Sequence, residues 1–245
     1  MSNNIITLNA EQIPPLGGRG ALLSLLHLTD PTLPIGGFSH SAGLETYVQQ
    51  GIVKDTASVK AFVVQMLSQN LRYTDAAFVA LVMDAASDNH LEKILLLDDE
   101  CTAVKLPKEM RQASNKLGLR LMKIFQPIHE NDLLNKYALA IKSQEVLGHY
   151  CIAFGLIAYA MGITKAEALQ GFYYNAAVGF VTNAVKLVPL SQQSGQQILF
   201  SVHGVIGDLV GQTLKPDRDL IGLCCTSFDI KSMQHERLYS RLYMS

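Results

Sequence analysis

The chain has 245 residues, of which 49% are hydrophobic and 17% charged, so it can bury a sizeable core and is too apolar to be disordered. Lys and Arg total 20 against 21 for Asp and Glu, a balance that argues against nucleic acid or a membrane surface as a partner. The first residues lack the pattern of a signal peptide, and the four cysteines show no CxxC spacing. We therefore expect a cytoplasmic protein with reduced thiols.

Apolar residues recur at helical spacing through nearly the whole sequence, without the sustained alternation that is typical of strands. This pattern predicts an all-α, single-domain bundle of about eight to ten helices. In chain order, Asp55 is expected to cap one helix, Pro107 to open a second, and Thr164 with Glu167 to form the capping box of a third that ends before Pro189. The stretch at 150–163 is apolar but shorter than the roughly 20 residues that span a bilayer.

Later in the chain, an apolar pattern over 198–209 predicts one further helix that ends before Pro216. Gly148, Gly155 and Gly162 lie seven residues apart and predict that another helix packs closely there. No linker or composition shift divides the chain. We therefore expect a flexible segment over 1–20, one helical domain over 21–232, and a C-terminal tail over 233–245 that binds a partner.

The segment TDPTLPIGGFSHSAGLE (29–45) interrupts two helical patterns with two prolines and a Gly-Gly pair. Pro34 fixes its own backbone, Gly36 and Gly37 permit positive φ, and Ser39 or Ser41 can cap the helix that follows. These features predict a shaped loop that leads into a capped helix.

The catalytic motifs that this segment superficially resembles are incomplete. No lysine follows Gly43, as a phosphate-binding loop requires, and the Gly37–Ser41 stretch does not match a nucleophile elbow. The adjacent Ser39 and His40 are poorly placed for a catalytic pair. We predict no catalytic residue, and the alternative is an all-α hydrolase that uses Ser39, His40 and a distant carboxylate, Glu45 or Asp75.

Metal chemistry has no local signature, because the seven histidines include no HxH, HxxxH or HExxH pattern. His149 and Cys151 are expected in the core, and Cys224 with Cys225 reads as a pair of buried thiols. We therefore predict no cofactor and no metal ligand. An open alternative is a metal site shared by two subunits, built from His40, His235 or Cys224.

Two surfaces each have two interpretations. Lys116, Arg120 and Lys123 form a stripe on the predicted helix after Pro107, which is typically a solvated face and alternatively a docking surface. The tail carries tyrosine and arginine, the residue types that dominate binding hot spots. It is either a partner-binding element or an ordinary terminal helix packed through Leu238 and Leu242.

Three segments together resemble the signature regions of the UreF family of urease accessory proteins. They are LPIGGFSHSAGLE (33–45), VKLVPLSQQSGQ (185–196) and MQHERLYSRLYMS (233–245), and RQASNKLGLRL (111–121) is also similar to the family pattern. Phe38 stands where some members have tyrosine. The resemblance covers the chain except for about the first twenty residues.

The resemblance implies an all-α, non-catalytic homodimer that bridges the accessory protein UreD (UreH) and the GTPase UreG during nickel insertion into apo-urease. It also implies that the chain modulates the GTPase cycle of UreG. Carried onto this sequence, the loop at 34–43 and the tail form the partner-binding surfaces. The residues assigned to them are Pro34, Gly36, Phe38, His40, Ser41, Glu45, Gln234, His235, Glu236, Tyr239, Arg241 and Tyr243.

Overall fold

A computed structural model gives the structure of the protein for residues 19–223 and 225–244, except the side chains of residues 19, 20 and 38. Across this part of the chain the structure is helical, has no strand and forms one domain, which confirms the predicted class. It contains helices α1 to α12, slightly more than predicted, because short helices such as the six-residue α2 give little periodic signal. The predicted flexible segment lies largely outside the described residues.

The α-helices are α1 (Arg19–Leu28), α2 (Leu44–Gln49), α3 (Thr56–Gln65), α4 (Asp75–Ser87), α5 (Leu91–Val104), α6 (Lys108–Phe125), α7 (Asp132–Lys142), α8 (Tyr150–Ala160), α9 (Lys165–Leu187), α10 (Gln192–Ser201), α11 (His203–Thr213) and α12 (Thr226–His235). A π-helical segment, η3 (Met66–Asn70), and the 3-10 turn η4 (Leu71–Tyr73) continue α3. Other 3-10 turns are η2 (Gly37–Ser39), η5 (Gln126–Ile128) and η6 (Arg218–Leu220).

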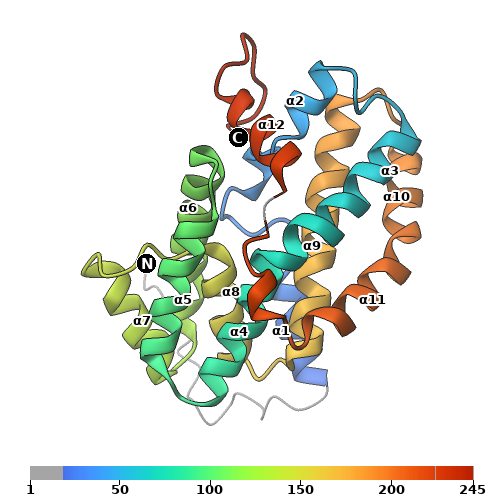
Figure 1. Ribbon diagram of the computed structural model, residues 1–245. Coiled ribbons are helices and arrows are strands. Elements are labelled where there is room, and N and C mark those ends of the chain that lie inside the picture. Colours follow the sequence, from blue (N-terminus) through green and yellow to red (C-terminus); the bar gives the residue numbers. More distant parts are fainter. Residues whose placement is uncertain (1–18, 224, 245) are drawn as a thin grey trace, which may run out of the picture.

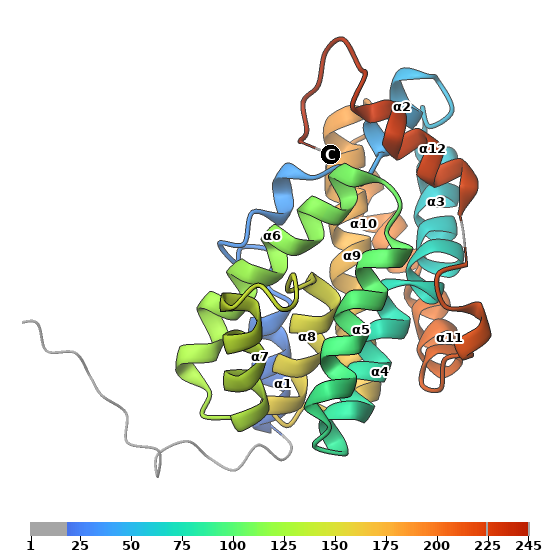
Figure 2. The same cartoon turned by 60° about the vertical axis from the view of Figure 1, so that its left-hand side comes forward.

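The helices form two groups around the packed pair α4 and α8. Helices α5, α6 and α7 lie on one side, and the long α9 with α3, α10 and α11 lies on the other (Figure 1). Helices α2 and α12 contact each other at one end of the bundle, together with the C-terminal residues (Figure 2). Within the described chain, no helix combines the length and apolarity needed to cross a membrane.

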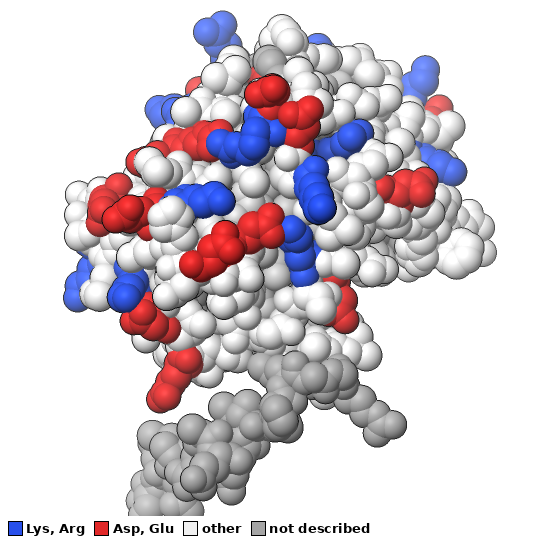
Figure 3. Space-filling view, turned by 60° about the horizontal axis from the view of Figure 1, so that its bottom comes forward, with Lys and Arg blue, Asp and Glu red and all other residues white. Residues whose placement is uncertain are grey.

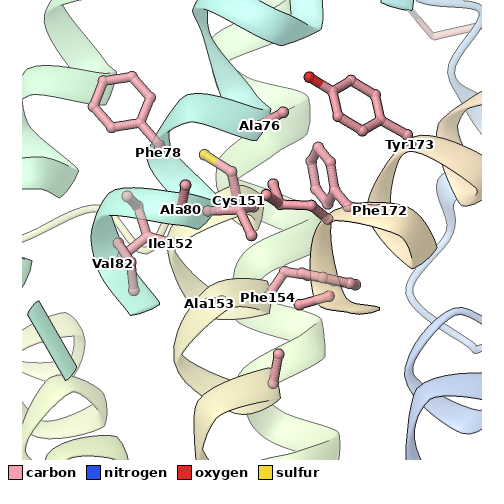
Figure 4. Packing of buried hydrophobic residues seen from close by; sticks show 14 of the residues in the cluster. Ala76, Phe78, Ala80, Val82, Cys151, Ile152, Ala153, Phe154, Phe172 and Tyr173 are labelled. Carbon is pink, nitrogen blue, oxygen red and sulfur yellow. The ribbon is translucent and has the colours of Figure 1, made fainter. Parts of the chain in front are cut away.

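The centre of the core is the contact between α4 and α8, both of which are apolar on nearly every side. Ala76–Met83 of α4 and Cys151–Ala158 of α8 are buried, and Phe172 and Tyr173 of α9 pack beside them (Figure 4). A Cβ atom at Gly155 would stand 3.0 Å from the Val79 carbonyl oxygen, so this glycine permits the close approach that its spacing predicts.

The helix boundaries mostly follow the local signals. Asp55 caps α3, Thr164 and Glu167 form a reciprocal capping box at α9, and α9 ends at Leu187, two residues before Pro189. One prediction was wrong: the pattern over 198–209 is not one helix. It breaks after Ser201 into α10 and α11, because an apolar stripe alone does not record a change in helix direction.

Candidate functional site

Residues 29–43, which connect α1 to α2, form an extended loop between α6 and α9 that we call the strap (Figure 1). Two asparagines of α9 hold it from one side. Asn175 Nδ2 donates to the Thr29 carbonyl oxygen and Asn183 Nδ2 donates to the His40 carbonyl oxygen, each at 2.8 Å. The two ends of the strap are therefore fixed to one helix.

Helix α6 holds the middle of the strap. Arg120 Nη1 donates to the Ile35 carbonyl oxygen at 2.8 Å, so Arg120 does more than contribute to a solvated face. Gly36 follows with φ of 82°, and a Cβ atom there would stand 2.3 Å from Arg120 Nη1. The left-handed backbone favours glycine at this position, and a Cβ atom would in addition displace the Arg120 guanidinium.

The serines of the strap do not cap α2 in the predicted manner. Helix α2 begins after Gly43, which is its N-cap residue and provides no side-chain acceptor. The Ser39 hydroxyl donates to the Gly36 carbonyl oxygen at 2.7 Å, and buried Ser41 accepts a long bond of 3.5 Å from the Glu45 N–H. Ser39 therefore stabilises the turn of the strap itself.

Glu45, at the start of α2, connects the strap to the C-terminal tail. Its carboxylate is buried, with 3% of the residue exposed, and accepts hydrogen bonds from the Leu242 N–H at 2.7 Å and the Tyr243 N–H at 3.1 Å. The Met244 N–H donates to the Ser39 carbonyl oxygen at 2.9 Å. The two segments that were predicted separately as partner-binding regions therefore lie against each other.

His235, the last residue of α12, lies between two carboxylates. Its Nε2 is 3.2 Å from Glu45 Oε2 and its Nδ1 is 2.8 Å from Glu109 Oε2, and the ring is fully buried. The ring therefore connects α12 to both α2 and α6. Arg241 Nη1 also donates to Glu109, at 2.8 Å, and thereby fixes the tail to α6.

The remaining residues assigned to the tail differ in exposure. Tyr239 is fully exposed, Gln234 and Glu236 are exposed, and Tyr243 is only 6% exposed. In the strap Pro34 is exposed, and the Phe38 side chain lies outside the described part of the structure. Tyr239 is therefore the aromatic side chain that the tail presents to solvent.

Three buried hydroxyls, those of Thr46, Ser232 and Tyr243, have no hydrogen-bond partner among the described residues. They belong to α2, α12 and the tail, the three segments that meet around Glu45. Burial raises the pKa of the Tyr243 phenol, and the nearby Glu45 carboxylate raises it further. Where the tail packs against the domain, some buried hydroxyl groups therefore lack hydrogen-bond partners within the described structure.

Beneath the strap lies a cavity of about 310 Å³. Apolar side chains of the strap, α6 and α9 form most of its wall, including Ile35, Met110 and Phe172. The Asp75–Lys105 ion pair, at 2.7 Å, forms a buried polar part of the wall. Burial alone would raise the pKa of Asp75, but the charge and hydrogen bonds of Lys105 outweigh it and leave that pKa lowered.

His40 also lines the cavity, where burial lowers its pKa and the charges of Lys116 and Arg120 lower it further. Both carboxylates considered for a hydrolase, Glu45 and Asp75, are bound to other groups of the chain. Among the described residues, no three His, Cys, Asp or Glu side chains are grouped as metal ligands.

Cysteine burial follows the prediction in part. Cys151 and His149 are fully buried as expected, Cys225 is only half-buried, and Cys224 lies outside the described residues. The segment 185–196 forms the turn from α9 to α10, where Ser191 caps α10.

The sequence did not reveal that four residues hold the strap or the tail in place: Glu109, Arg120, Asn175 and Asn183. Each acts on a segment more than 80 positions away in the chain, such as Asn183 on His40. No local pattern encodes contacts of that kind.

Comparison with known proteins identifies the family. The UreF family model matches residues 53–203, more than half of the chain. The urease accessory protein UreF of Actinobacillus pleuropneumoniae serotype 5b is 50% identical over 226 residues, a match that spans 92% of this chain and 100% of that protein. The UreF proteins of Haemophilus influenzae strain PittEE and of Arthrobacter sp. strain FB24 are 48% and 31% identical, over 91% of this chain in each case. These matches cover 94% and 96% of the two relatives, and the chain belongs to the UreF family of urease accessory proteins.

Proposed function

We propose that this chain is a non-catalytic adaptor that bridges UreD (UreH) and the GTPase UreG during nickel insertion into apo-urease. The observation that carries the proposal is the position of Glu45, which binds the tail backbone at Leu242 and Tyr243 next to the strap. Two segments from opposite ends of the chain thereby form one composite surface. Such a surface can contact two partners at once, which an adaptor must do.

The chemistry of the composite surface supports protein binding. Tyr239 is fully exposed on the tail, and Arg241 is 39% exposed in its side chain while it pairs with Glu109. Tyrosine and arginine are the residue types that contribute most to hot spots. Figure 3 shows Lys and Arg interspersed with Asp and Glu on one face of the molecule, a pattern that supports protein partners over nucleic acid.

We further propose that nickel reaches urease through the assembled complex, that the chain itself has no catalytic role, and that it modulates the GTPase cycle of UreG in the cytoplasm. The Ser39 hydroxyl supports the non-catalytic role, because it donates to the Gly36 carbonyl oxygen instead of to a base. Activation of a serine nucleophile requires the opposite arrangement, in which a base accepts the hydroxyl proton.

The homodimer that we propose forms through α10 and α11. Phe200 is 76% exposed, and its ring contacts His203, which in turn contacts Tyr174. Residues 192–214 contain no Lys, Arg or Glu, and Asp208 is their one Asp. A charge-poor aromatic face can pack against its own copy across a two-fold axis without like-charge repulsion. Phe200→Glu should give a monomer in light scattering, whereas Leu139→Glu, at an exposed leucine of α7, should leave the dimer intact.

The adaptor role is tested by reconstitution with UreD, UreG and apo-urease from the same organism. Deletion of residues 236–245 should abolish UreG recruitment and urease activation, and Tyr239→Ala should weaken both. Leu139→Ala is the matched control, because Leu139 is 64% exposed and lies on α7. Unchanged recruitment and activation after the deletion would contradict the role given to the tail.

A further inference from the structure

The cavity beneath the strap opens to solvent between the strap and α9. Gly37 of the strap and Gly179 of α9 both line it and are both exposed. A Cβ atom at either position would meet nothing within 4 Å. The two glycines therefore leave an entrance in the surface that any larger side chain would narrow.

The interior suits an uncharged, apolar group. Its walls include Met110, Leu117 and Phe172. In its buried ion pair, Asp75 and Lys105 bind each other. Both carboxylate oxygens of Asp75 accept from Lys105 Nζ, at 2.8 and 2.7 Å. A second charge inside would have to compete with this pair, whereas an apolar side chain would gain burial at no such cost.

The edge of the cavity that α6 provides is positively charged. Helix α6 carries five basic residues and one acidic residue, Glu109, which is already bound to His235 and Arg241. Arg120 is exposed and donates to the carbonyl oxygen of Ile35, which lines the cavity, and Lys116 is exposed one helical turn before it. A carboxylate beside this edge would find two exposed cations.

We propose that the cavity receives one apolar side chain of a partner protein, and that an acidic residue next to that side chain pairs with Lys116 and Arg120. The inference rests on the proposed adaptor function and specifies the chemistry by which one partner is recognised. The volume of about 310 Å³ is enough for a large side chain and supports an anchor residue in a pocket, the usual form of a hot spot. The positive edge of α6 fixes the direction from which the partner segment enters.

Filling the cavity tests the apolar half of the proposal. Gly179→Leu places a side chain in the entrance, where its Cβ atom meets nothing within 4 Å, and leucine is a better helix former than glycine. Gln170→Leu is the control, because it adds an exposed leucine to α9 at a position that does not line the cavity. Affinities for UreD and for UreG are measured separately by biolayer interferometry, and circular dichroism and thermal unfolding establish that each variant is folded.

Reversing a charge tests the acidic half. Lys116→Glu should weaken the same partner that Gly179→Leu weakens, and added NaCl should weaken the unmodified complex more than the Lys116→Glu complex. Lys60→Glu is the control, since Lys60 is an exposed lysine on α3.

We expect Gly179→Leu and Lys116→Glu each to weaken one partner by about tenfold or more, and both controls to bind normally. If the unmodified chain binds UreD and UreG and the Gly179→Leu variant binds each of them with the affinity of the unmodified chain, the inference is overturned and the adaptor function stands. A small molecule retained in the cavity in native mass spectrometry, with partner affinity unchanged in Gly179→Leu, also overturns it. If the unmodified chain binds neither partner, both proposals fail.

Discussion

Replacing Glu45 by glutamine should release the C-terminal tail without unfolding the helical domain. Glutamine retains one acceptor oxygen, so in either orientation its amide NH2 group faces one of the two backbone N–H donors, Leu242 or Tyr243, that now bond to the Glu45 carboxylate. The lost bond to a charged group costs about 1.5–3 kcal/mol, and the surviving bond weakens to the roughly 0.5–1.5 kcal/mol of a neutral one, so the two effects together cost about 3 kcal/mol. The tail can avoid this cost by detaching, so the effect should appear as local opening.

Hydrogen exchange of the C-terminal peptide, followed by mass spectrometry, measures that opening directly. A cost of about 3 kcal/mol corresponds to roughly 100-fold faster exchange at the amides of Leu242, Tyr243 and Met244. The control is Glu145→Gln, the same change at an exposed glutamate between α7 and α8. The reasoning is refuted if these amides exchange at the unmodified rate in Glu45→Gln.

Three further changes test other parts of the structure. Gly36→Ala should lower the melting temperature and speed hydrogen exchange in the strap, because φ is 82° at this position and a guanidinium nitrogen stands 2.3 Å from the new Cβ atom. Gly37→Ala is the control and should change neither property, because its Cβ atom meets nothing within 4 Å. Gly118→Ala should abolish soluble, folded protein, because its Cβ would lie 2.1 Å from a backbone oxygen; normal expression and circular dichroism would contradict this. Lys105→Met should cost about 3–5 kcal/mol in urea unfolding at pH 7, because it leaves Asp75 buried and unpaired. The pKa of Asp75 is lower in the folded protein than in the unfolded chain, where it is about 4. The ion pair therefore stabilises the fold fully above about pH 4 and loses this effect as the pH falls through the pKa of the folded state. The penalty for Lys105→Met should therefore shrink in acid.

Features with a local cause could be predicted from the sequence. The capping box at Thr164 and Glu167, the cap at Asp55 and the end of α9 before Pro189 depend on residues within a few positions of each other. Helical periodicity likewise sufficed for the all-α class. The break at Val202 between α10 and α11 was missed because both helices continue the same apolar stripe.

The site could be predicted only as separate segments. The strap and the tail were identified as regions of interest, yet nothing in either segment indicates that Glu45 accepts from Leu242, 197 positions later. Arg120 illustrates the same difficulty, since its spacing places it on a solvated face and its contact with Ile35 depends on how α6 packs. Long-range polar contacts of this kind are fixed by tertiary structure.

The three unpaired hydroxyls of Thr46, Ser232 and Tyr243 bear on how the tail can change partners. Each buried hydroxyl without a partner costs about 1–3 kcal/mol. These costs offset part of the free energy by which the bonds to Glu45 stabilise the docked tail. When the tail lifts away together with α12, water or a partner protein can satisfy all three groups. A ligand that supplies these missing bonds would draw the tail outward without breaking into the hydrophobic core, and the domain between α1 and α11 would stay folded while its C-terminal surface is rebuilt.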